Sequence, residues 1–311
     1  MDHPRQTVLI TGASSGIGLA TARLLASHGF RVLAGVRSDR GREAVENALS
    51  PHLEPVWLDV THDDQVSALV DDLHRRLPGG LFALINNAGI GPPAAVELSA
   101  IEDVRRVLEV NTLAPLRMIQ ACLPLLRRGR GRIVNMSSMN GTLALPMVGA
   151  YSASKFALEA LGNSLRVELR PWNIPISVIR PGQVRTPIFD KARQALQQGA
   201  RDIPADLSAG YGKLYDRAAK FNERGARTGA APEAIARVVL RVLTARRPRP
   251  CYTIGLDVRG LHLAQALLPT RWFDSLLALV SGAVRSEPRQ ASRSESPPVE
   301  HSDAAAPTSP R

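Results

Sequence analysis

The sequence predicts an α/β domain with a doubly wound parallel sheet, and two features of the chain indicate this fold class. Short apolar runs rich in Val, Ile and Leu recur along the chain, and segments of helical period separate them. Strict alternation of strand and helix produces parallel strands joined by right-handed crossovers, with helices on both faces of the sheet. The expected strands lie at residues 8–10, 31–34, 55–58, 81–85, 132–136 and 176–179, with a seventh around 252–254.

The length and composition fit one such domain with an appended tail. A chain of 311 residues, of which 44% are hydrophobic, can bury one large core. Two segments depart from the alternation: residues 185–228 lack a strand signal and are expected to form a helical lid over a site, and residues 261–283 are expected to form a C-terminal helical extension. Residues 1–285 are therefore the expected folded domain. Residues 286–311, rich in Ser, Pro, Ala and charge, are an expected disordered tail.

The formal net charge of +11 raises nucleic acid and anionic membranes as possible partners. The arginines are scattered among acids, with short clusters only at 127–132 and 246–249. This distribution favours a solvated basic surface, so no nucleic-acid partner is expected. The apolar stripe at 261–280 is expected to pack on its own domain or on a second subunit, with a weak membrane-surface contact as the alternative.

The two cysteines, Cys122 and Cys251, lie far apart and in no metal-binding spacing. Neither a disulfide nor a metal site is therefore predicted. The N-terminal residues run directly into an apolar strand, without the charged and apolar regions of a signal peptide. These features predict a cytoplasmic protein.

Three glycines follow the first strand in the stretch TGASSGIG, residues 11–18. Gly12 allows a sharp turn, Gly16 lets the backbone approach a pyrophosphate, and Gly18 lets helix and strand pack tightly. The amides at the start of the helix then face the phosphates with a favourable dipole. The spacing differs from the common GxGxxG, but its place between the first strand and the first helix predicts a dinucleotide site. The cofactor-binding residues expected in this turn are Gly12, Ser14, Ser15, Gly16, Ile17 and Gly18.

The end of the second strand favours NADP over NAD. An NAD site usually carries a carboxylate there, whereas an NADP site needs a cation. Gly35 stands at the carboxylate position and Arg37 follows it, and a guanidinium can bind a 2′-phosphate through charge-assisted bonds. Asp39 and Arg40 keep NAD open as the alternative.

Two more strand ends are expected at the same edge of the sheet. Asp59 follows the third strand together with Val60. Its carboxylate is expected to accept a bond from an adenine amino group, and capping of the next helix is the alternative. The fourth strand ends in NNAG, which places Asn87, Ala88 and Gly89 at this edge.

The stretch YSASK places Tyr151 at the start of a helix expected from about residue 152 to residue 169, with Lys155 one turn further on. Both side chains therefore leave the same helix face. An ammonium about 5 Å from a phenolate contributes roughly 3 kcal/mol at an effective dielectric constant of about 20, or about two pK units. The pKa of Tyr151 is thereby expected near neutral pH, where a general acid or base works. A solvated surface pair is the alternative.

Polar residues that could act with this pair precede it in the chain. Ser137 and Ser138 end the fifth strand, and a serine hydroxyl there can donate to a carbonyl oxygen and hold it beside the tyrosine. Asn111 lies in the middle of an expected helix, where asparagine is unfavourable and a functional reason is expected. A serine nucleophile is less favoured because neither a GxSxG elbow nor a well-placed histidine accompanies these serines.

The ordered set of motifs resembles the classical short-chain dehydrogenases/reductases over about residues 5–260. The motifs are TGxxxGxG at 11–18, NNAG at 86–89, Asn111, Ser138, YxxxK at 151–155 and PG at 181–182. The resemblance implies a single Rossmann domain with seven parallel strands, with residues 1–285 as the catalytic domain. It also implies a homodimer or homotetramer formed through the long helices that contain Asn111 and Lys155.

The resemblance further implies roles for individual residues. Tyr151 would be the proton donor or acceptor, Ser138 would orient the substrate oxygen, and Lys155 would lower the pKa of Tyr151 and bind the nicotinamide ribose. The helix position of Asn111 would secure a water in the proton relay. Val184 and Thr186, in the segment PGQVRTP, would hold the carboxamide.

The predicted function is hydride transfer between NADP, or alternatively NAD, and a carbonyl or secondary alcohol. The stretch RVLAGVRSDRG and the extended C-terminal part look similar to the branch that contains retinol and hydroxysteroid dehydrogenases. Apolar residues after Ser138 favour an apolar steroid-, retinoid- or fatty-like substrate; they are Met139, Leu143, Leu145, Met147 and Val148. The alternatives are a catalytically idle NADP-sensing regulatory protein and a basic surface binder of nucleic acid or membrane.

Overall fold

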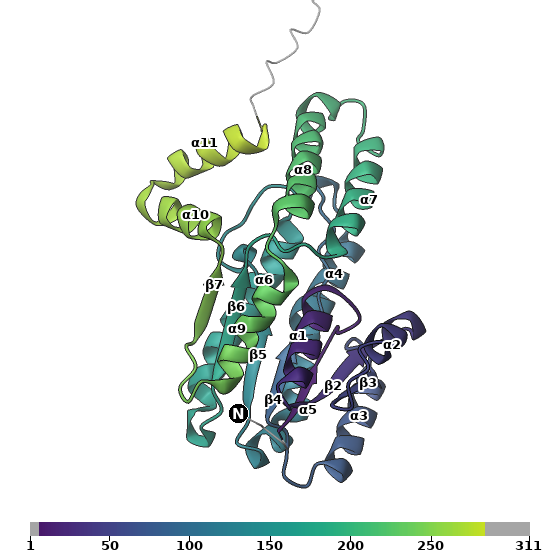
Figure 1. The fold of residues 1–311 in the computed structure, drawn as a ribbon. Helices are drawn as coiled ribbons and strands as arrows, with labels where there is room; N and C mark the ends of the chain where they lie inside the picture. Colours follow the sequence, from purple (N-terminus) through teal and green to yellow (C-terminus); the bar gives the residue numbers. More distant parts are fainter. Residues whose placement is uncertain (1–5, 284–311) are drawn as a thin grey trace, which may run out of the picture.

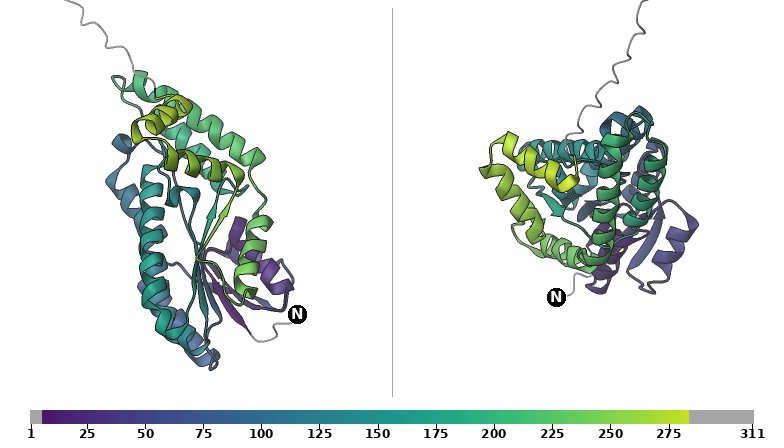
Figure 2. Two further views of the ribbon diagram at one scale, coloured as in Figure 1. Left: turned by 90° about the vertical axis from the view of Figure 1, so that its left-hand side faces the viewer. Right: turned by 90° about the horizontal axis from the view of Figure 1, so that it is seen from above.

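A computed structural model describes residues 6–283 of the chain, which form one α/β structure. Its seven strands are all parallel, in the order β3-β2-β1-β4-β5-β6-β7, as predicted. Helices cover both faces of the twisted sheet (Figures 1 and 2). The strands are β1 (Thr7–Ile10), β2 (Arg31–Val36), β3 (Leu53–Trp57), β4 (Ala83–Asn86), β5 (Arg132–Met136), β6 (Ile176–Pro181) and β7 (Cys251–Ile254).

Two buried cores lie on opposite faces of this sheet. One contains apolar side chains of the helices α1 and α9, and the other contains those of α3 and α5. The buried strands carry Val, Ile and Leu on both faces, as expected for a parallel sheet covered by helices. The helices are α1 (Gly16–Ser27), α2 (Asp39–Glu46), α3 (Asp63–Arg76), α4 (Ile101–Leu108), α5 (Ala114–Arg128), α6 (Gly149–Glu168), α7 (Ile188–Arg201), α8 (Ser208–Thr228), α9 (Pro232–Thr244), α10 (Leu256–Leu267) and α11 (Thr270–Ser281).

The segment 185–228 contains α7 and α8, which extend together beyond the carboxyl edge of the sheet (Figure 1).

The helices α10 and α11 form an arm beside α8 at the same end of the molecule (Figures 1 and 2). The arm is attached at two places. Phe273 is buried against Met139 and Leu143, and Arg217 of α8 donates hydrogen bonds of 2.8 and 3.0 Å to the last carbonyl groups of α11.

The helical extension begins at Leu256, a few residues before the expected position, because α10 follows β7 almost directly. The expected tail at 286–311 lies outside the described residues. Among residues 6–283, the structure contains no helix that combines the length and the apolar character needed to span a bilayer.

Candidate active site

The turn between β1 and α1 forms an open cradle of backbone amides. Gly12 and Gly16 have positive φ angles of 65° and 54°, which favour glycine. A Cβ atom added to Gly18 would lie only 2.3 Å from the carbonyl oxygen of Gly12. A side chain at position 18 would therefore push the helix away from the turn. The free backbone amides at the start of α1 can therefore bind a phosphate group, as a dinucleotide-binding site requires.

The NNAG motif supports this turn from the end of β4. Asn87 donates from Nδ2 to the carbonyl oxygens of Thr11 and Gly12, each at 2.9 Å. The hydroxyl of Thr11 accepts from the backbone amides of Asn87 and Ala88, each at 3.0 Å. Asn87 therefore holds the glycine turn in place, a structural task that its position in the sequence alone did not reveal.

A cavity of about 490 Å³ runs along the carboxyl edge beside this turn. The predicted cofactor residues that line it are Gly12, Ser14, Ser15, Gly16, Ile17, Gly18, Arg37, Asp59, Val60, Asn87, Ala88, Gly89 and Thr186. Tyr151, Lys155 and Val184 line the adjoining cavity. The structure adds two cations that the sequence analysis did not select: Arg106 of α4 and Lys191 of α7. No local pattern marks either residue, because only the packing of α4 and α7 brings them to the cavity.

Arg37 and Asp59 face each other in this cavity. The guanidinium Nη1 of Arg37 lies 3.5 Å from a carboxylate oxygen of Asp59, and the Arg37 side chain remains 55% exposed. Burial acts to raise the pKa of Asp59, but the bonds from Thr61 and Arg37 outweigh it and leave that pKa below its usual value. Asp59 accepts both bonds from Thr61, which precedes α3, and makes no cap bond to that helix. Asp59 and Arg37 both line the cavity, at the end expected for adenosine.

Tyr151 and Lys155 lie on one face of α6, which begins at Gly149. The Nζ atom of Lys155 is 5.8 Å from the centre of the Tyr151 ring. Lys155 is only 4% exposed and donates to the carbonyl oxygen of Met136 at 2.9 Å. A Cβ added to Gly91 would lie 2.8 Å from the ring of Tyr151, so the bare backbone after β4 leaves room for the phenol. The pair is held within the site and is not a solvated surface pair.

Burial dominates the protonation of this pair. It raises the pKa of Tyr151, while the hydrogen bond with Ser138 acts to lower it. Burial also lowers the pKa of Lys155 to about 8, and the nearby carboxylate of Glu159 acts to raise it. The expectation of a Tyr151 pKa near neutral is therefore wrong for the cofactor-free chain. The estimate from the sequence counted the attraction between the charges but not the desolvation of the phenolate.

Asn111 lies in the wider helical turn that connects α4 and α5. Residues Glu109–Leu113 form a π-helical turn. The Asn111 side chain donates to the carbonyl oxygen of Ile90 at 2.7 Å and to the hydroxyl of Ser154 at 2.9 Å, and it accepts from the Ile90 amide at 2.9 Å. Asn111 thus links α6 to the loop after β4. A π turn breaks the regular pattern of backbone bonds and is often found at functional sites.

A buried ion pair lies behind the site and was not selected from the sequence. Arg180 of β6 donates two hydrogen bonds of 2.8 Å to the two carboxylate oxygens of Glu159, which is 6% exposed. Glu159 lies one turn after Lys155, and Arg180 directly precedes the PG segment. A Cβ added to Gly141 would lie 3.0 Å from Glu159, so the turn after Ser138 packs on the same pair. Three functional segments therefore meet at one salt bridge.

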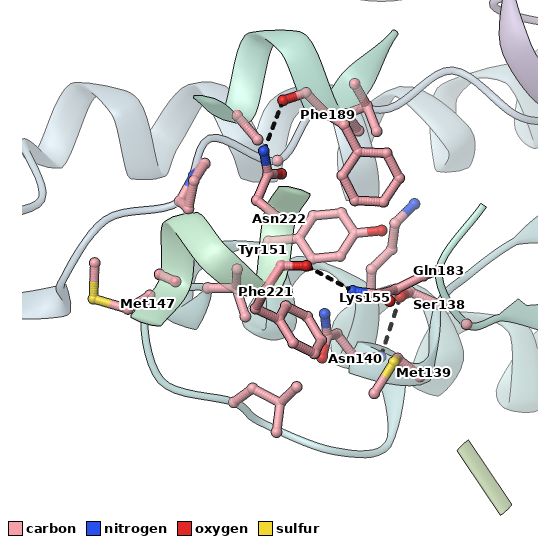
Figure 3. Close-up of a pocket in the computed structure, with 18 of the residues that line it drawn as sticks. Ser138, Met139, Asn140, Met147, Tyr151, Lys155, Gln183, Phe189, Phe221 and Asn222 are labelled. Atoms are coloured by element: carbon pink, nitrogen blue, oxygen red, sulfur yellow. Dashed lines mark hydrogen bonds between the residues drawn. The ribbon is translucent and has the colours of Figure 1, made fainter. Parts of the chain in front are cut away.

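The second cavity, of about 370 Å³, is lined in part by α7 and α8 and adjoins the first. Ser138, Tyr151 and Lys155 line this cavity together with Phe189 of α7 and with Phe221 and Asn222 of α8 (Figure 3). Of the apolar residues expected here, Leu143 does not line the cavity, because it packs beneath it against Phe273 of the arm. The other four do line it; they are Met139, Leu145, Met147 and Val148. Leu277 and Val280 of α11 complete the wall.

Comparison with known proteins agrees with this architecture. The family model described as short chain dehydrogenase matches residues 6–197. Mouse (Mus musculus) retinol dehydrogenase 5 is 35% identical over 280 residues, which cover 88% of each chain. A short-chain dehydrogenase/reductase from Burkholderia phymatum, solved with NAD, has a TM-score of 0.71 and 26% identity, and covers 86% of this chain and 96% of its own.

A second solved structure carries the other cofactor type. The alcohol dehydrogenase from Thermococcus sibiricus, complexed with 5-hydroxy-NADP, has a TM-score of 0.63 and 25% identity, and covers 80% of this chain and 96% of its own. The chain belongs to the short-chain dehydrogenase family. It is an oxidoreductase that uses a nicotinamide dinucleotide and acts on a CH–OH or C=O group of a small molecule, as the sequence predicts.

Proposed function

We propose that this oxidoreductase uses NADP(H) and interconverts ketones and secondary alcohols of apolar substrates, with Asn111, Ser138, Tyr151 and Lys155 as its catalytic tetrad. One observation carries the proposal. Ser138, Tyr151 and Lys155 line the lid-covered cavity, and Gly89 and Gly91, which lie next to Lys155 and Tyr151, line both cavities. A substrate carbonyl in the first cavity can there meet a nicotinamide that enters from the second.

The proposed roles follow from chemistry and position. When bound, the nicotinamide supplies or accepts the hydride. Tyr151 donates its proton to the carbonyl oxygen during reduction and takes one back during oxidation, and the Ser138 hydroxyl donates to the same oxygen. The ammonium of Lys155 stabilises the phenolate and binds the ribose. The widened turn at Asn111 is the proposed place for a water of the proton relay.

The proposed cofactor contacts use the cavity beside the glycine turn. Amides of Gly16–Gly18, together with Ser14 and Ser15, would hold the pyrophosphate. Val60 and Asp59 would hold the adenine, and the segment from Val184 to Thr186 would hold the carboxamide. A Cβ added to Gly16 would lie 2.9 Å from the Thr186 side chain. The proposed carboxamide segment and the glycine turn are therefore in contact.

Arg37 supports the choice of NADP. Its side chain is more than half exposed in the cavity, and its 3.5 Å contact with Asp59 is long for a charge-assisted bond. The guanidinium can therefore exchange this contact for the dianionic 2′-phosphate. Gly35 offers no carboxylate to bind the ribose hydroxyls of NAD.

The cavity supports an apolar substrate, which is the finer part of the proposal. Methionine, leucine, valine and phenylalanine side chains of four separate segments line it. Large apolar walls with few polar groups bind ligands of the same character. The similar retinol dehydrogenase from Mus musculus acts, by its name, on an apolar alcohol.

Two exposed apolar surfaces support proposals about assembly. Leu113, Phe156 and Val167 are exposed on the π turn and α6, and we propose that a homodimer or homotetramer buries them. Sedimentation velocity tests this proposal, and a monomer at micromolar concentration would contradict it.

Trp272 and Leu279 are among the exposed apolar residues of the arm formed by α10 and α11. We propose that a second subunit covers the arm. The alternative is a weak contact of the arm with an anionic membrane surface. We also propose that the protein is cytoplasmic. Salt-sensitive flotation with anionic vesicles would support the alternative.

The central test compares two tyrosine variants. Purified protein is mixed with NADPH, and separately with NADH, across a panel of apolar ketones while the loss of absorbance is followed. Tyr151→Phe is expected to bind NADPH with the affinity of the wild type and to lose turnover. Tyr252→Phe, in β7 and away from both cavities, is the matched control and should retain turnover. Turnover by Tyr151→Phe would refute the mechanism, and NADPH binding without turnover by the wild type would favour an idle sensor.

A further inference from the structure

Asn140 is a polar residue of the substrate cavity to which the tetrad gives no role. It lies two residues after Ser138, in the short helical turn Met139–Gly141, and it lines the cavity. Its backbone amide donates to the Ser138 hydroxyl at 3.2 Å. Figure 3 shows its side chain leaving the same turn as Ser138 and Met139. The position of Asn140 is therefore tied to that of the hydroxyl that would orient the substrate carbonyl.

The hydrogen bonding of Asn140 differs from that of Gln183 and Asn222, two other side-chain amides that line the cavity. Gln183 donates to the carbonyl oxygen of Phe221 at 3.3 Å, and Asn222 donates to that of Phe189 at 3.0 Å. Both amides thereby fasten the lid. The side-chain oxygen of Asn140 is buried and has no hydrogen-bond partner in the described part of the chain. A buried polar atom without a partner costs stability of about 1–3 kcal/mol, so such an atom calls for an explanation.

A ligand oxygen would explain it. The terminal torsion of an asparagine side chain is broad and roughly two-fold, so the amide can turn either end toward the cavity. With Nδ2 facing the cavity, Asn140 donates to a carbonyl or hydroxyl oxygen, and Oδ1 stays unpaired. With Oδ1 facing it, Asn140 accepts from a hydroxyl, and the buried oxygen gains the partner that it lacks.

We propose that Asn140 is a specificity-determining residue that binds a second oxygen of the substrate, a hydroxyl or carbonyl group within a few bonds of the reacting carbon. The substrate is then an apolar hydroxyketone or diketone, or the corresponding diol in the reverse direction. The short connection between Ser138 and Asn140 sets this spacing, because both groups belong to one turn. The second oxygen takes no part in the redox step. This inference rests on the proposed function, since it concerns the same cavity.

The physical basis of the selectivity is the buried amide. A site that is built to hydrogen-bond a substrate group rejects the analogue that lacks the group, because the protein atom is then left unpaired. One neutral hydrogen bond in such a site is expected to change kcat/KM by about tenfold. An apolar side chain at position 140 removes this discrimination and leaves the apolar walls in place.

The experiment compares a methyl ketone with its 3-hydroxy analogue of equal chain length, using NADPH and the full chain. The quantity measured is the ratio of kcat/KM for the two ketones. Intrinsic reactivity differs between the ketones, but it cancels when this ratio is compared between wild type and variant. The variants are Asn140→Leu and, as a second choice if that protein does not fold, Asn140→Ala. Met139→Leu, one residue earlier in the same wall, is the matched control for changes of shape without loss of an amide.

Asn140→Leu or Asn140→Ala is expected to lower the ratio of hydroxyketone to ketone by about tenfold, whereas Met139→Leu should move both kcat/KM values in parallel. The proposal is overturned if the ratio stays at the wild-type value in the Asn140 variants, or if Met139→Leu lowers it equally. Failure of the wild type to reduce either ketone, or any ketone of the wider panel, would instead contradict the proposed function. The two failures are therefore distinguishable.

Discussion

Replacing Lys155 with methionine is expected to slow alcohol oxidation by about 100-fold below about pH 8, where Lys155 carries its charge. The ammonium lies 5.8 Å from the centre of the tyrosine ring. Two unit charges at this distance interact by about 3 kcal/mol at an effective dielectric constant of about 20, which corresponds to about two pK units. Oxidation needs the phenolate as a base, and loss of the cation lowers the phenolate population by that factor.

The assay follows NADPH formation from a secondary alcohol across a series of pH values. Below about pH 8, where Lys155 carries its charge, the rate of Lys155→Met should be about one hundredth of the wild-type rate, and the difference should shrink as pH rises above 8. Lys220→Met, on the exposed side of α8, is the matched control and should show the wild-type profile. A Lys155→Met enzyme that oxidises the alcohol at the wild-type rate below pH 8 would refute the electrostatic argument.

Four further outcomes are expected. Lys155→Met should raise stability below pH 8, because burial lowers the pKa of Lys155 to about 8 from its ordinary value of 10.5 and the unfolded chain therefore binds the proton more tightly. The gain of about 2 kcal/mol, net of the lost bond to Met136, should shrink as pH rises from 8 towards 10.5 and can be measured by denaturant unfolding. Gly18→Ala should abolish tight dinucleotide binding, because the new Cβ would lie 2.3 Å from the Gly12 oxygen, whereas Gly210→Ala in open space on α8 should bind normally in the same fluorescence titration. Arg37→Gln should weaken NADPH binding by at least about tenfold and leave NADH binding nearly unaltered, which titration of both cofactors checks. Phe273→Ala should loosen the arm, seen as faster hydrogen exchange in α10 and α11 with little change in β5.

The sequence was sufficient for features that depend on local spacing. The strand at 132–136 was predicted with the bounds that the structure shows, because Gly131 and Ser137 flank the segment around Ile133 and Val134. Tyr151 and Lys155 were correctly placed on one helix face, since a spacing of four residues fixes that relation. The carboxyl ends of parallel strands lie at one edge of the sheet, so residues that follow different strands could be assigned to one site.

Features that depend on packing between distant elements could not be predicted in this way. Lys191 and Arg106 reach the dinucleotide cavity only through the docking of α7 and α4. Leu143 was expected at the substrate cavity, but the arm covers it from the other side. The unusual place of Asn111 in a helix pointed to a function, yet the sequence did not show the π turn around it. The pKa of Tyr151 depends on burial, which no spacing reveals.

The salt bridge between Glu159 and Arg180 has a consequence for engineering this enzyme. It joins the turn after Ser138, the helix of Lys155 and the strand that leads into the PG segment. Removing one partner of a buried ion pair costs far more than replacing both by apolar groups. A chimera that takes a substrate loop from a relative would therefore succeed only if residues 159 and 180 both come from the same protein. A chimera in which they come from different proteins could leave one charge of the pair without its partner, directly behind the catalytic residues.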